Sequence, residues 1–428
     1  MAELLGHRPD RLKAGEELWT CLRVSSLALA RQVLCRADDA QRARRADAFS
    51  AGTGERRRSL TQGFHDRCEA YVFAGLPPAA ADEEPLRTRM PFRVHALSAA
   101  RKVVRSGEEL DLSGPRSAEE QVETFCVANF GTLVLEPGAR LVVRGRVLSL
   151  LCQRLVRLGR DRDEGFAGYA DHGGYDLGVL PAPGGPGVEG ADGVEGAHGR
   201  AGADGKRGRD AVPEPTMFGR VARRPASPEV LAGQDGQPGD AGRRGRRGHH
   251  GTAARCAEIT IREIIGGPFV VLARPGDGGA GGAGGAGGTG GRGGDGGLGG
   301  WSLPHPVVGG AGGRGGDGGA GGTGGRGGDG GDASPVFVTV PFGQRESVLP
   351  RALPGEPGPG GAAGAPGRGG AGGRGGDGPT DAVRSSADGG PGTAGRPGEP
   401  GQAGHRSPAP RILIETAPPP WSPPQPTS

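Results

Sequence analysis

The densest group of side chains that could do chemistry lies within residues 159–183. It combines carboxylates with a histidine and two tyrosines, and its members are Asp161, Asp163, Glu164, Tyr169, Asp171, His172, Tyr175 and Asp176. Carboxylates beside a histidine could carry out acid–base catalysis or bind a metal. Their spacing fits neither a calcium loop nor a zinc motif, so the sequence favours a solvated loop over an active site here.

A second motif, Gly-Gly-Xaa-Gly-Xaa-Asp, occurs at residues 290–295, 312–317, 324–329 and 372–377. It matches the first six positions of a calcium-binding nonapeptide repeat, but glycine or proline stands where that repeat needs an apolar eighth residue. We therefore expect no metal and no cofactor. The plainer interpretation is ion pairing at a spacing of three, and the pairs are Arg292 with Asp295, Arg314 with Asp317, Arg326 with Asp329 and Arg374 with Asp377. Their expected role is solubility and register.

The element that positions these residues is a repeat with glycine at every third position. It occurs in six blocks, here called arms 1 to 6, with a non-repeating tip inside each successive pair. The arms are residues 184–210, 233–253, 276–302, 310–333, 355–378 and 389–406. Glycine at this period suits a polyproline II helix, which rises about 3.1 Å per residue and has no internal hydrogen bonds. The paired arms then span roughly 84 and 65, 84 and 74, and 74 and 56 Å, as out-and-back hairpins require.

Alternating or apolar strand signals separate the pairs of arms, at residues 257–264, 269–273, 336–340 and 412–414. The chain therefore alternates between strand, outward arm, tip, return arm and strand. Arms 3 and 4 carry two glycines per triplet, which allows close contact on two sides and predicts a central position for them. Backbone groups of the arms must find partners in neighbouring arms or in water.

The predicted fold class is mainly β plus polyproline II. It comprises an N-terminal helix, a β-sandwich or solenoid platform, and a six-arm polyglycine II or collagen-like bundle made of three hairpins. Residues 10–48 favour helix because Leu18, Leu22, Ser25, Leu29 and Val33 fall on one face. The expected domains are 1–107 (helix and linker), 108–183 (β platform), 184–406 (arms, with strands 257–273 and 335–349 completing the platform) and 407–428 (final strand and Pro-rich tail).

Resemblance supports this architecture. Triplets such as those of residues 395–401, Gly-Arg-Pro-Gly-Glu-Pro-Gly, resemble bacterial collagen-like proteins, and the Gly-Gly-Xaa runs resemble the glycine-rich domains of mycobacterial polymorphic glycine-rich proteins. As an architecture, the expected bundle is similar to polyglycine II phage tail-tip adhesins and to the springtail antifreeze protein. The resemblance covers about residues 184–406 and implies backbone geometry more than activity.

Composition narrows the function classes. The formal charge of +4 arises from 52 basic and 48 acidic side chains, so no general attraction to nucleic acid is expected. The six cysteines contain no Cys-X-X-Cys pair, and Cys126 and Cys152 lie within apolar runs typical of buried strands. We identify no signal peptide and no transmembrane segment. A cell-surface or extracellular location is favoured only by the general appearance of the repeats.

The tips are the better binding candidates, because recognition usually sits on loops held by a rigid scaffold. If the hairpins align, the three tips gather at the distal end. Their candidate contact residues are Met217, Phe218, Arg220, Arg223, Arg224, Trp301, His305 and Arg384. Aromatic and arginine side chains are typical of interaction sites, and the expected partner is a surface or another protein rather than a specific nucleic acid.

Three functions stay open at this point. The first is a non-enzymatic structural or adhesive protein, as a monomer that displays its tips. The second is a homotrimeric collagen-like extracellular matrix component. The third is a β-solenoid carbohydrate-active enzyme that uses the residues between Asp161 and Asp176. Ice binding is a further alternative, since Ala280, Ala283, Ala286 and Thr289 form a row of small residues.

Overall fold

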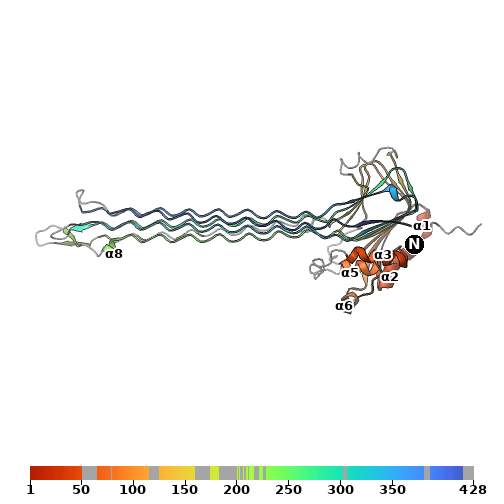
Figure 1. Ribbon diagram of the computed structural model, residues 1–428, viewed down its shortest axis with the longest axis horizontal. Helices are drawn as coiled ribbons and strands as arrows, with labels where there is room; N and C mark the ends of the chain where they lie inside the picture. The colour runs from red at the N-terminus through yellow and green to blue at the C-terminus, as the bar shows by residue number, and fades with distance from the viewer. Residues whose placement is uncertain are drawn as a thin grey trace, which may run out of the picture.

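A computed structural model describes most of the chain, and Figure 1 shows a base of sheets and helices from which a long, narrow shaft projects. The described residues are 1–50, 65–78, 80–114, 125–159, 174–182, 200, 202, 206, 209–210, 212–215, 221–224, 228–301, 306–379 and 386–417. The shaft consists of the described residues of arms 1 to 6.

The larger sheet of the base has eight strands. Their order is β1-β2-β4-β6-β10-β15-β17, and β11 also pairs with β6. β1 runs antiparallel to β2, whereas every later pairing in this sheet is parallel. The strands are β1 (Leu18–Val24), β2 (Phe92–Val104), β4 (Phe125–Leu135), β6 (Val147–Arg157), β10 (Ala257–Ile261), β11 (Ile264–Ile265), β15 (Val336–Val340) and β17 (Ile412–Thr416).

The second sheet has five parallel strands in the order β16-β12-β7-β5-β3. They are β3 (Glu109–Asp111), β5 (Arg140–Arg144), β7 (Leu177–Leu180), β12 (Phe269–Ala273) and β16 (Val348–Ala352). Apart from β11, which follows β10 in the large sheet, the strands of the base alternate between the two sheets from β2 onward, and each new strand lies beside the previous strand of its own sheet. Pro137 and Gly138 form the turn between β4 and β5: Gly138 has a φ of 77°, and the Ala139 N–H donates to the Glu136 carbonyl at 3.0 Å.

Two apolar cores lie on opposite faces of the large sheet, because successive side chains of a strand point to opposite sides. In β4, Cys126 and Ala128 belong to the core shared with the second sheet, whereas Phe125 and Val127 belong to the core shared with the helices. The predicted burial of Cys126 and Cys152 is confirmed.

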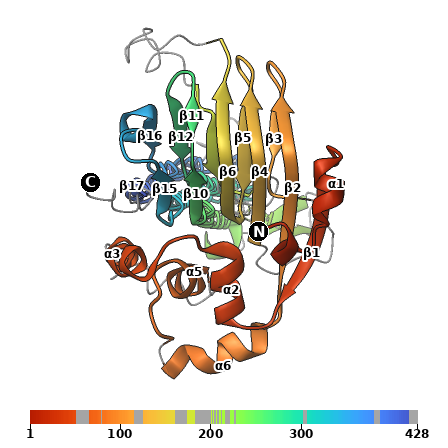
Figure 2. The same ribbon diagram turned by 90° about the vertical axis from the view of Figure 1, so that its right-hand side faces the viewer.

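The N-terminal helices supply the second core, and Figure 2 shows α2, α3, α5 and α6 together on one side of the sheets. Val33 and Leu34 of α2 and Phe73 of α5 pack in this core with Phe125 and Phe337 of the large sheet. The helical elements are η1 (Glu3–Leu5), α1 (Pro9–Lys13), α2 (Leu27–Leu34), α3 (Asp39–Ser50), α5 (His65–Phe73) and α6 (Ala80–Arg89).

The predicted fold class is wrong. The protein has an α/β fold with a large mixed sheet of eight strands, a second sheet of five and few helices, rather than a mainly β and polyproline II class with a β-sandwich or solenoid platform and a polyglycine II or collagen-like bundle. The prediction gave most weight to the glycine repeat. It missed that the N-terminal residues form a helical layer packed on the large sheet.

The helix predicted over residues 10–48 is also interrupted. Residues 18–24 form β1, whose seven residues all pair with β2, from Leu18 opposite Ser98 to Val24 opposite Phe92. The spacing of Leu18 and Leu22 fits a helix, but pairing with an available sheet edge outweighs local propensity. Leu29 and Val33 lie in α2, which Ser26 caps by accepting the Leu29 N–H at 3.2 Å.

The shaft is inserted into the base at three equivalent places. Arms 1 and 2 connect β7 to β10, arms 3 and 4 connect β12 to β15, and arms 5 and 6 connect β16 to β17, so each pair of arms leads from the second sheet back to the large one. Parallel strands lie about 4.8 Å apart. Neighbouring arms therefore leave and re-enter the base at adjacent strands. At this spacing, extended backbones can form hydrogen bonds with each other.

Glycine N–H groups tie the arms together at intervals of three residues. Arms 3 and 4 are each bonded to four other arms. For arm 3, the bonds include Gly202 N to Thr289 O, Gly288 N to Asp240 O, Gly319 N to Gly288 O and Gly290 N to Arg368 O, all at 2.8 Å. For arm 4, they include Gly239 N to Asp317 O at 2.9 Å, and Gly316 N to Gly291 O, Gly370 N to Gly316 O and Gly318 N to Thr393 O at 2.8 Å.

These contacts explain why the two inner arms carry two glycines per triplet. A Cβ at Gly322 would collide with the backbone carbonyl of Arg243 in arm 2, and one at Gly321 would collide with that of Gly364 in arm 5. Arm 4 is thus flanked by backbone at both positions of each Gly-Gly pair.

Candidate functional site

The tip residues named from the sequence are only partly described. Met217, Phe218, Arg220, His305 and Arg384 lie outside the described residues. The backbone of the other three is described: Arg223 and Arg224 lie in β9 (Val221–Arg224), and Trp301 ends β13 (Gly300–Trp301).

Two of the three tips lie together at the far end of the shaft. In the first, β8 (Val212–Pro215) pairs antiparallel with β9, and α8 (Pro228–Leu231) follows. In the second, β13 pairs antiparallel with β14 (Pro306–Val307). β9 and β13 contact each other, so the backbones carrying Arg223, Arg224 and Trp301 belong to one cluster. Figure 1 shows this cluster at the opposite end of the molecule from the base.

The predicted ion pairs along the arms are confirmed at three of the four positions. The guanidinium and carboxylate groups lie 2.9 Å apart for Arg292 and Asp295, 3.0 Å for Arg314 and Asp317, and 3.2 Å for Arg326 and Asp329. The fourth arginine, Arg374, uses its backbone, because its N–H donates to Asp295 at 2.8 Å.

Aspartates also connect neighbouring arms, and three of them, Asp295, Asp317 and Asp329, belong to these pairs. Carboxylate oxygens accept backbone N–H groups from the adjacent arm in six contacts of 2.6 to 2.9 Å, one of which joins Asp210 to Leu298. The other five are Asp235 from Arg314, Asp277 from Glu356, Asp295 from Arg374, Asp317 from Thr393, and Asp329 from His405. A carboxylate that already accepts an N–H and pairs with an arginine holds two arms together and is not free to bind calcium. Among the described residues, no group of three His, Cys, Asp or Glu side chains could hold a metal.

The catalytic-looking set before arm 1 is described at Tyr175 and Asp176, while residues 160–173 lie outside the described residues. Asp176 is buried, pairs with the Arg157 guanidinium at 2.8 Å, and accepts the Val270 N–H at 2.7 Å. Burial lowers the pKa of Arg157, and the Asp176 charge opposes that shift. Asp176 therefore connects β6, β7 and β12.

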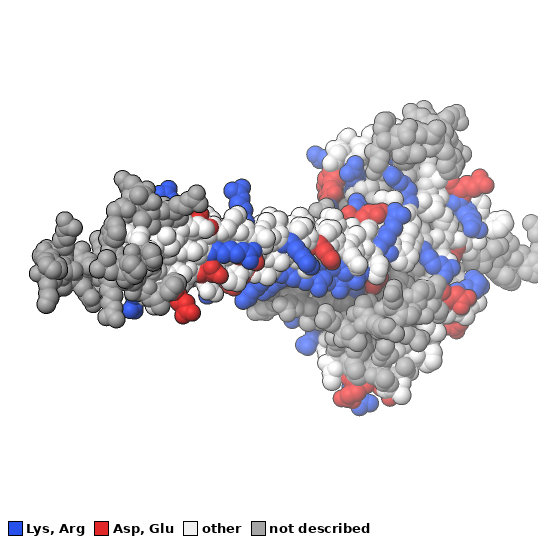
Figure 3. Space-filling model, turned by 60° about the vertical axis from the view of Figure 1, so that its left-hand side comes forward, with Lys and Arg blue, Asp and Glu red and all other residues white. Residues whose placement is uncertain are grey.

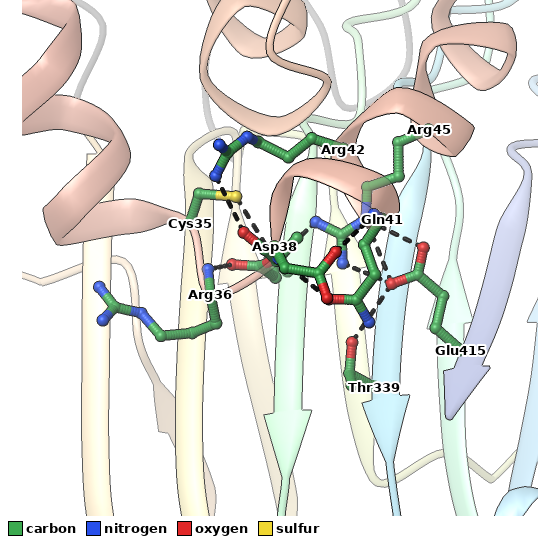
Figure 4. A network of polar contacts seen from close by, with 10 residues as sticks. Cys35, Arg36, Asp38, Gln41, Arg42, Arg45, Thr339 and Glu415 are labelled. Carbon is green, nitrogen blue, oxygen red and sulfur yellow. Dashed lines mark hydrogen bonds and ion pairs between the residues drawn. The ribbon is translucent and has the colours of Figure 1, made fainter. Parts of the chain in front are cut away.

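A charged network between the helical layer and the large sheet was not foreseen from the sequence (Figure 4). Arg45 of α3 is completely buried and pairs with Glu258 of β10 and Glu415 of β17, each at 2.6 Å. Its guanidinium also lies 4.3 Å from the ring centre of Phe337. Burial lowers the pKa of Arg45, but the hydrogen bond to Glu415 and the charges of both glutamates outweigh burial and raise it.

A second buried carboxylate joins the helical layer to the ends of two arms. Glu69 of α5 accepts the Cys256 N–H at 3.3 Å and the Ser334 hydroxyl, and these two residues follow arms 2 and 4. Glu258 also accepts the Arg36 N–H at 2.6 Å. The sequence contains one signal for these buried ion pairs, a single acidic residue inside each of two apolar strands, Ala257–Ile261 and Ile412–Thr416. The partner of each acidic residue lies far away in the sequence.

An open pocket of about 480 Å³ lies beside this network, at the edge strand β17. Four arginines line it, together with Glu415 and the apolar residues of β17; they are Arg44, Arg45, Arg345 and Arg411. Charged side chains beside an edge strand are a common means of preventing edge-to-edge aggregation. Arg44 and Arg411 place exposed positive charge beside this edge.

Comparisons with known proteins identify no family for the chain. No protein-family model matches it, and no curated protein does. One solved structure, the springtail antifreeze protein from Granisotoma rainieri, described as a bundle of nine polyproline type II helices, is 26% identical. The match covers 50% of this chain and 94% of that chain, with a TM-score of 0.09, and at this score it carries no argument. Among the described residues, no helix is both long enough and apolar enough to span a membrane, as expected.

Proposed function

We propose that the protein is a non-enzymatic structural or adhesive protein that displays its tip loops at the end of a glycine-rich shaft. The observation that carries this proposal is the set of inter-arm hydrogen bonds, repeated every three residues over arms 2 to 6. A single extended segment would bend freely, whereas cross-linked arms resist bending as a unit. The shaft therefore keeps the tips away from the base.

Length supports the same proposal. A 24-residue arm spans at most about 85 Å, and the tip of arms 1 and 2 adjoins that of arms 3 and 4 at the distal end. A scaffold of this length serves no evident purpose in catalysis but is suited to contact at a distance. Loops on rigid scaffolds are common recognition sites.

A homotrimeric collagen-like matrix component remains the second candidate. The hydrogen bonds favour the single-chain form, because the described glycines of the inner arms donate to carbonyl groups of the same chain. For a carbohydrate-active enzyme, Asp176 offers little support, since its carboxylate is engaged with Arg157 and Val270.

The proposal can be tested by force measurement with the full chain. Cys21 is exposed in β1 at the base and allows attachment to a cantilever, leaving the tips outward. Adhesion is measured on silica, carboxylated polystyrene and methyl-terminated gold. We expect the variant Arg220→Gln/Arg223→Gln/Arg224→Gln to lose most of the adhesion, with Arg368→Gln/Arg374→Gln/Arg396→Gln as a charge-matched control on arms 5 and 6. Unchanged adhesion in the tip variant, or none with the parent protein, would eliminate the tips as the adhesive site.

A further inference from the structure

Arm 2 carries an unusually basic run in the half of the shaft near the base. Its triplets read Gly-Arg-Arg, Gly-Arg-Arg and Gly-His-His over residues 242–250, and all six basic side chains are exposed. We call Arg243, Arg244, Arg246 and Arg247 the arginine stripe. Figure 3 shows a row of Lys and Arg side chains along one side of the shaft near the base.

The backbone beneath the stripe is fixed on two sides. Gly245 and Gly248 donate to Thr323 and Arg326 of arm 4 at 3.0 and 2.9 Å. The carbonyls of Arg243 and Arg246 accept N–H groups of arm 3, from Gly285 and Gly282, both at 2.8 Å. With the glycines facing the shaft, both other positions of each triplet face outward. The arginine pairs therefore repeat about every 9 to 10 Å along a straight line.

Most of this charge is not neutralised by the described residues. Arg247 pairs with Asp329 at 2.8 Å, and the same carboxylate lies 3.3 Å from His250. Over the ranges that the structure describes, no carboxylate pairs with Arg243, Arg244 or Arg246. Like charges held this close repel one another, and an external anion would relieve that repulsion.

We propose that the arginine stripe binds a linear acidic polysaccharide lying along the shaft. Guanidinium groups bind carboxylate and sulfate oxygens through paired hydrogen bonds, and a ligand with regularly repeated anionic groups can bridge successive arginine pairs. Arm 2 contains no Phe, Trp or Tyr on which nucleic-acid bases could stack, so single-stranded nucleic acid fits less well. This surface is separate from the tips and does not depend on the proposed adhesive function.

The test uses the full chain with three probes: heparin (sulfate), alginate (carboxylate) and single-stranded DNA. Affinity is measured by calorimetry at 50, 100 and 200 mM NaCl. We expect Arg243→Gln/Arg244→Gln/Arg246→Gln to weaken polysaccharide binding about tenfold or more, because three of the four guanidinium groups of the stripe are removed. The dependence of affinity on salt should also become shallower, because fewer ions are released.

The matched control is Arg368→Gln/Arg374→Gln/Arg396→Gln, which removes the same charge from exposed positions on arms 5 and 6. It should bind within about twofold of the parent protein, as should the tip variant. Equal losses in the stripe and control variants would overturn the proposal in favour of diffuse attraction. Absence of binding to both polysaccharides would also overturn the proposal. So would DNA binding that is as tight as polysaccharide binding and depends on the stripe to the same extent.

Discussion

Asp317 of arm 4 accepts two hydrogen bonds from Thr393 of arm 6, at 2.7 Å from the backbone N–H and 2.8 Å from the hydroxyl. The two residues are 76 positions apart, and the same separation joins Asp329 to His405. Contacts of this kind fix how far one arm can slide along another. A slip by one triplet would keep the glycine pattern but remove the Thr393 hydroxyl from Asp317, because neither Gly390 nor Arg396 carries a hydroxyl.

This bond predicts a dependence on pH. The N–H and hydroxyl of Thr393 lower the pKa of Asp317 below its ordinary value. Because the folded pKa is depressed, the bond stabilises the shaft fully above the unfolded pKa of about 4 and loses this effect as the pH falls through the lower, folded value. Asp317→Asn should therefore show faster hydrogen exchange at Gly318 than the parent protein at pH 6, and the difference should shrink toward pH 3.

The control for this measurement is Asp240→Asn, an exposed aspartate of arm 2 whose side chain has no hydrogen bond or ion pair among the residues that the structure describes. It should leave exchange at Gly318 unchanged at both pH values. An Asp317→Asn protein with parental exchange at pH 6 would show that the carboxylate does not hold the register.

Glycine substitutions should differ sharply between a glycine packed inside the shaft and an exposed one. Gly322 donates to Gly285 at 2.8 Å and accepts from Gly364 at 2.9 Å, and a Cβ there would collide with the Arg243 carbonyl. Gly322→Ala must separate backbones, so we expect a loss of about 1–3 kcal/mol or more. At Gly390 no atom lies within 4 Å of an added Cβ. Gly390→Ala should be neutral or stabilise by up to about 1 kcal/mol, because alanine restricts the unfolded chain.

Thermal unfolding and hydrogen exchange of the shaft amides would measure both variants. Equal stability of the two proteins would contradict the close packing of Gly322 against arms 2, 3 and 5.

The sequence predicted local elements better than their assembly. The strands near residues 257, 269, 336 and 412 follow from apolar or alternating runs, and all four are present. Their division between two sheets could not be inferred, because the choice of strand partner depends on contacts far away in the sequence. Phe269–Ala273 lies in the second sheet, while the other three lie in the large one.

The same limit applies to the candidate sites. The Arg–Asp pairs along an arm were predictable because their members are three residues apart. The network around Arg45 was not, since Glu258 and Glu415 lie 213 and 370 positions from it. An isolated glutamate in an apolar strand indicates a buried partner but does not identify it. The helix prediction for residues 18–24 failed for a related reason, because their pairing with β2 decided their conformation.

Cysteine reactivity should distinguish the exposed thiol from the buried ones. Cys21 is exposed, whereas burial raises the pKa of Cys35 to about 11, with the Glu258 charge adding to the effect, and that of Cys152 to about 12. Thiolate is the reactive form. In a Cys68→Ser background, iodoacetamide at pH 8 should modify Cys21 within minutes and leave Cys35, Cys126, Cys152 and Cys256 unmodified until urea is added. Mass spectrometry of peptides would reveal early modification of Cys35, which would contradict the packing of α2 on the sheet.

Replacement of Arg45 should test how firmly the helical layer is held to β10 and β17. Arg45→Met leaves Glu258 buried without its cation, and we expect a loss of about 3–5 kcal/mol in the free energy of unfolding. Arg44→Met, one residue earlier but exposed, should change it by less than about 0.5 kcal/mol. Adding Glu258→Gln and Glu415→Gln to Arg45→Met should recover part of the loss, because the uncompensated charges are then removed. Urea unfolding followed by circular dichroism measures all three variants. A loss below about 1 kcal/mol for Arg45→Met would mean that apolar packing alone, rather than this ion pair, holds α3 to the sheet.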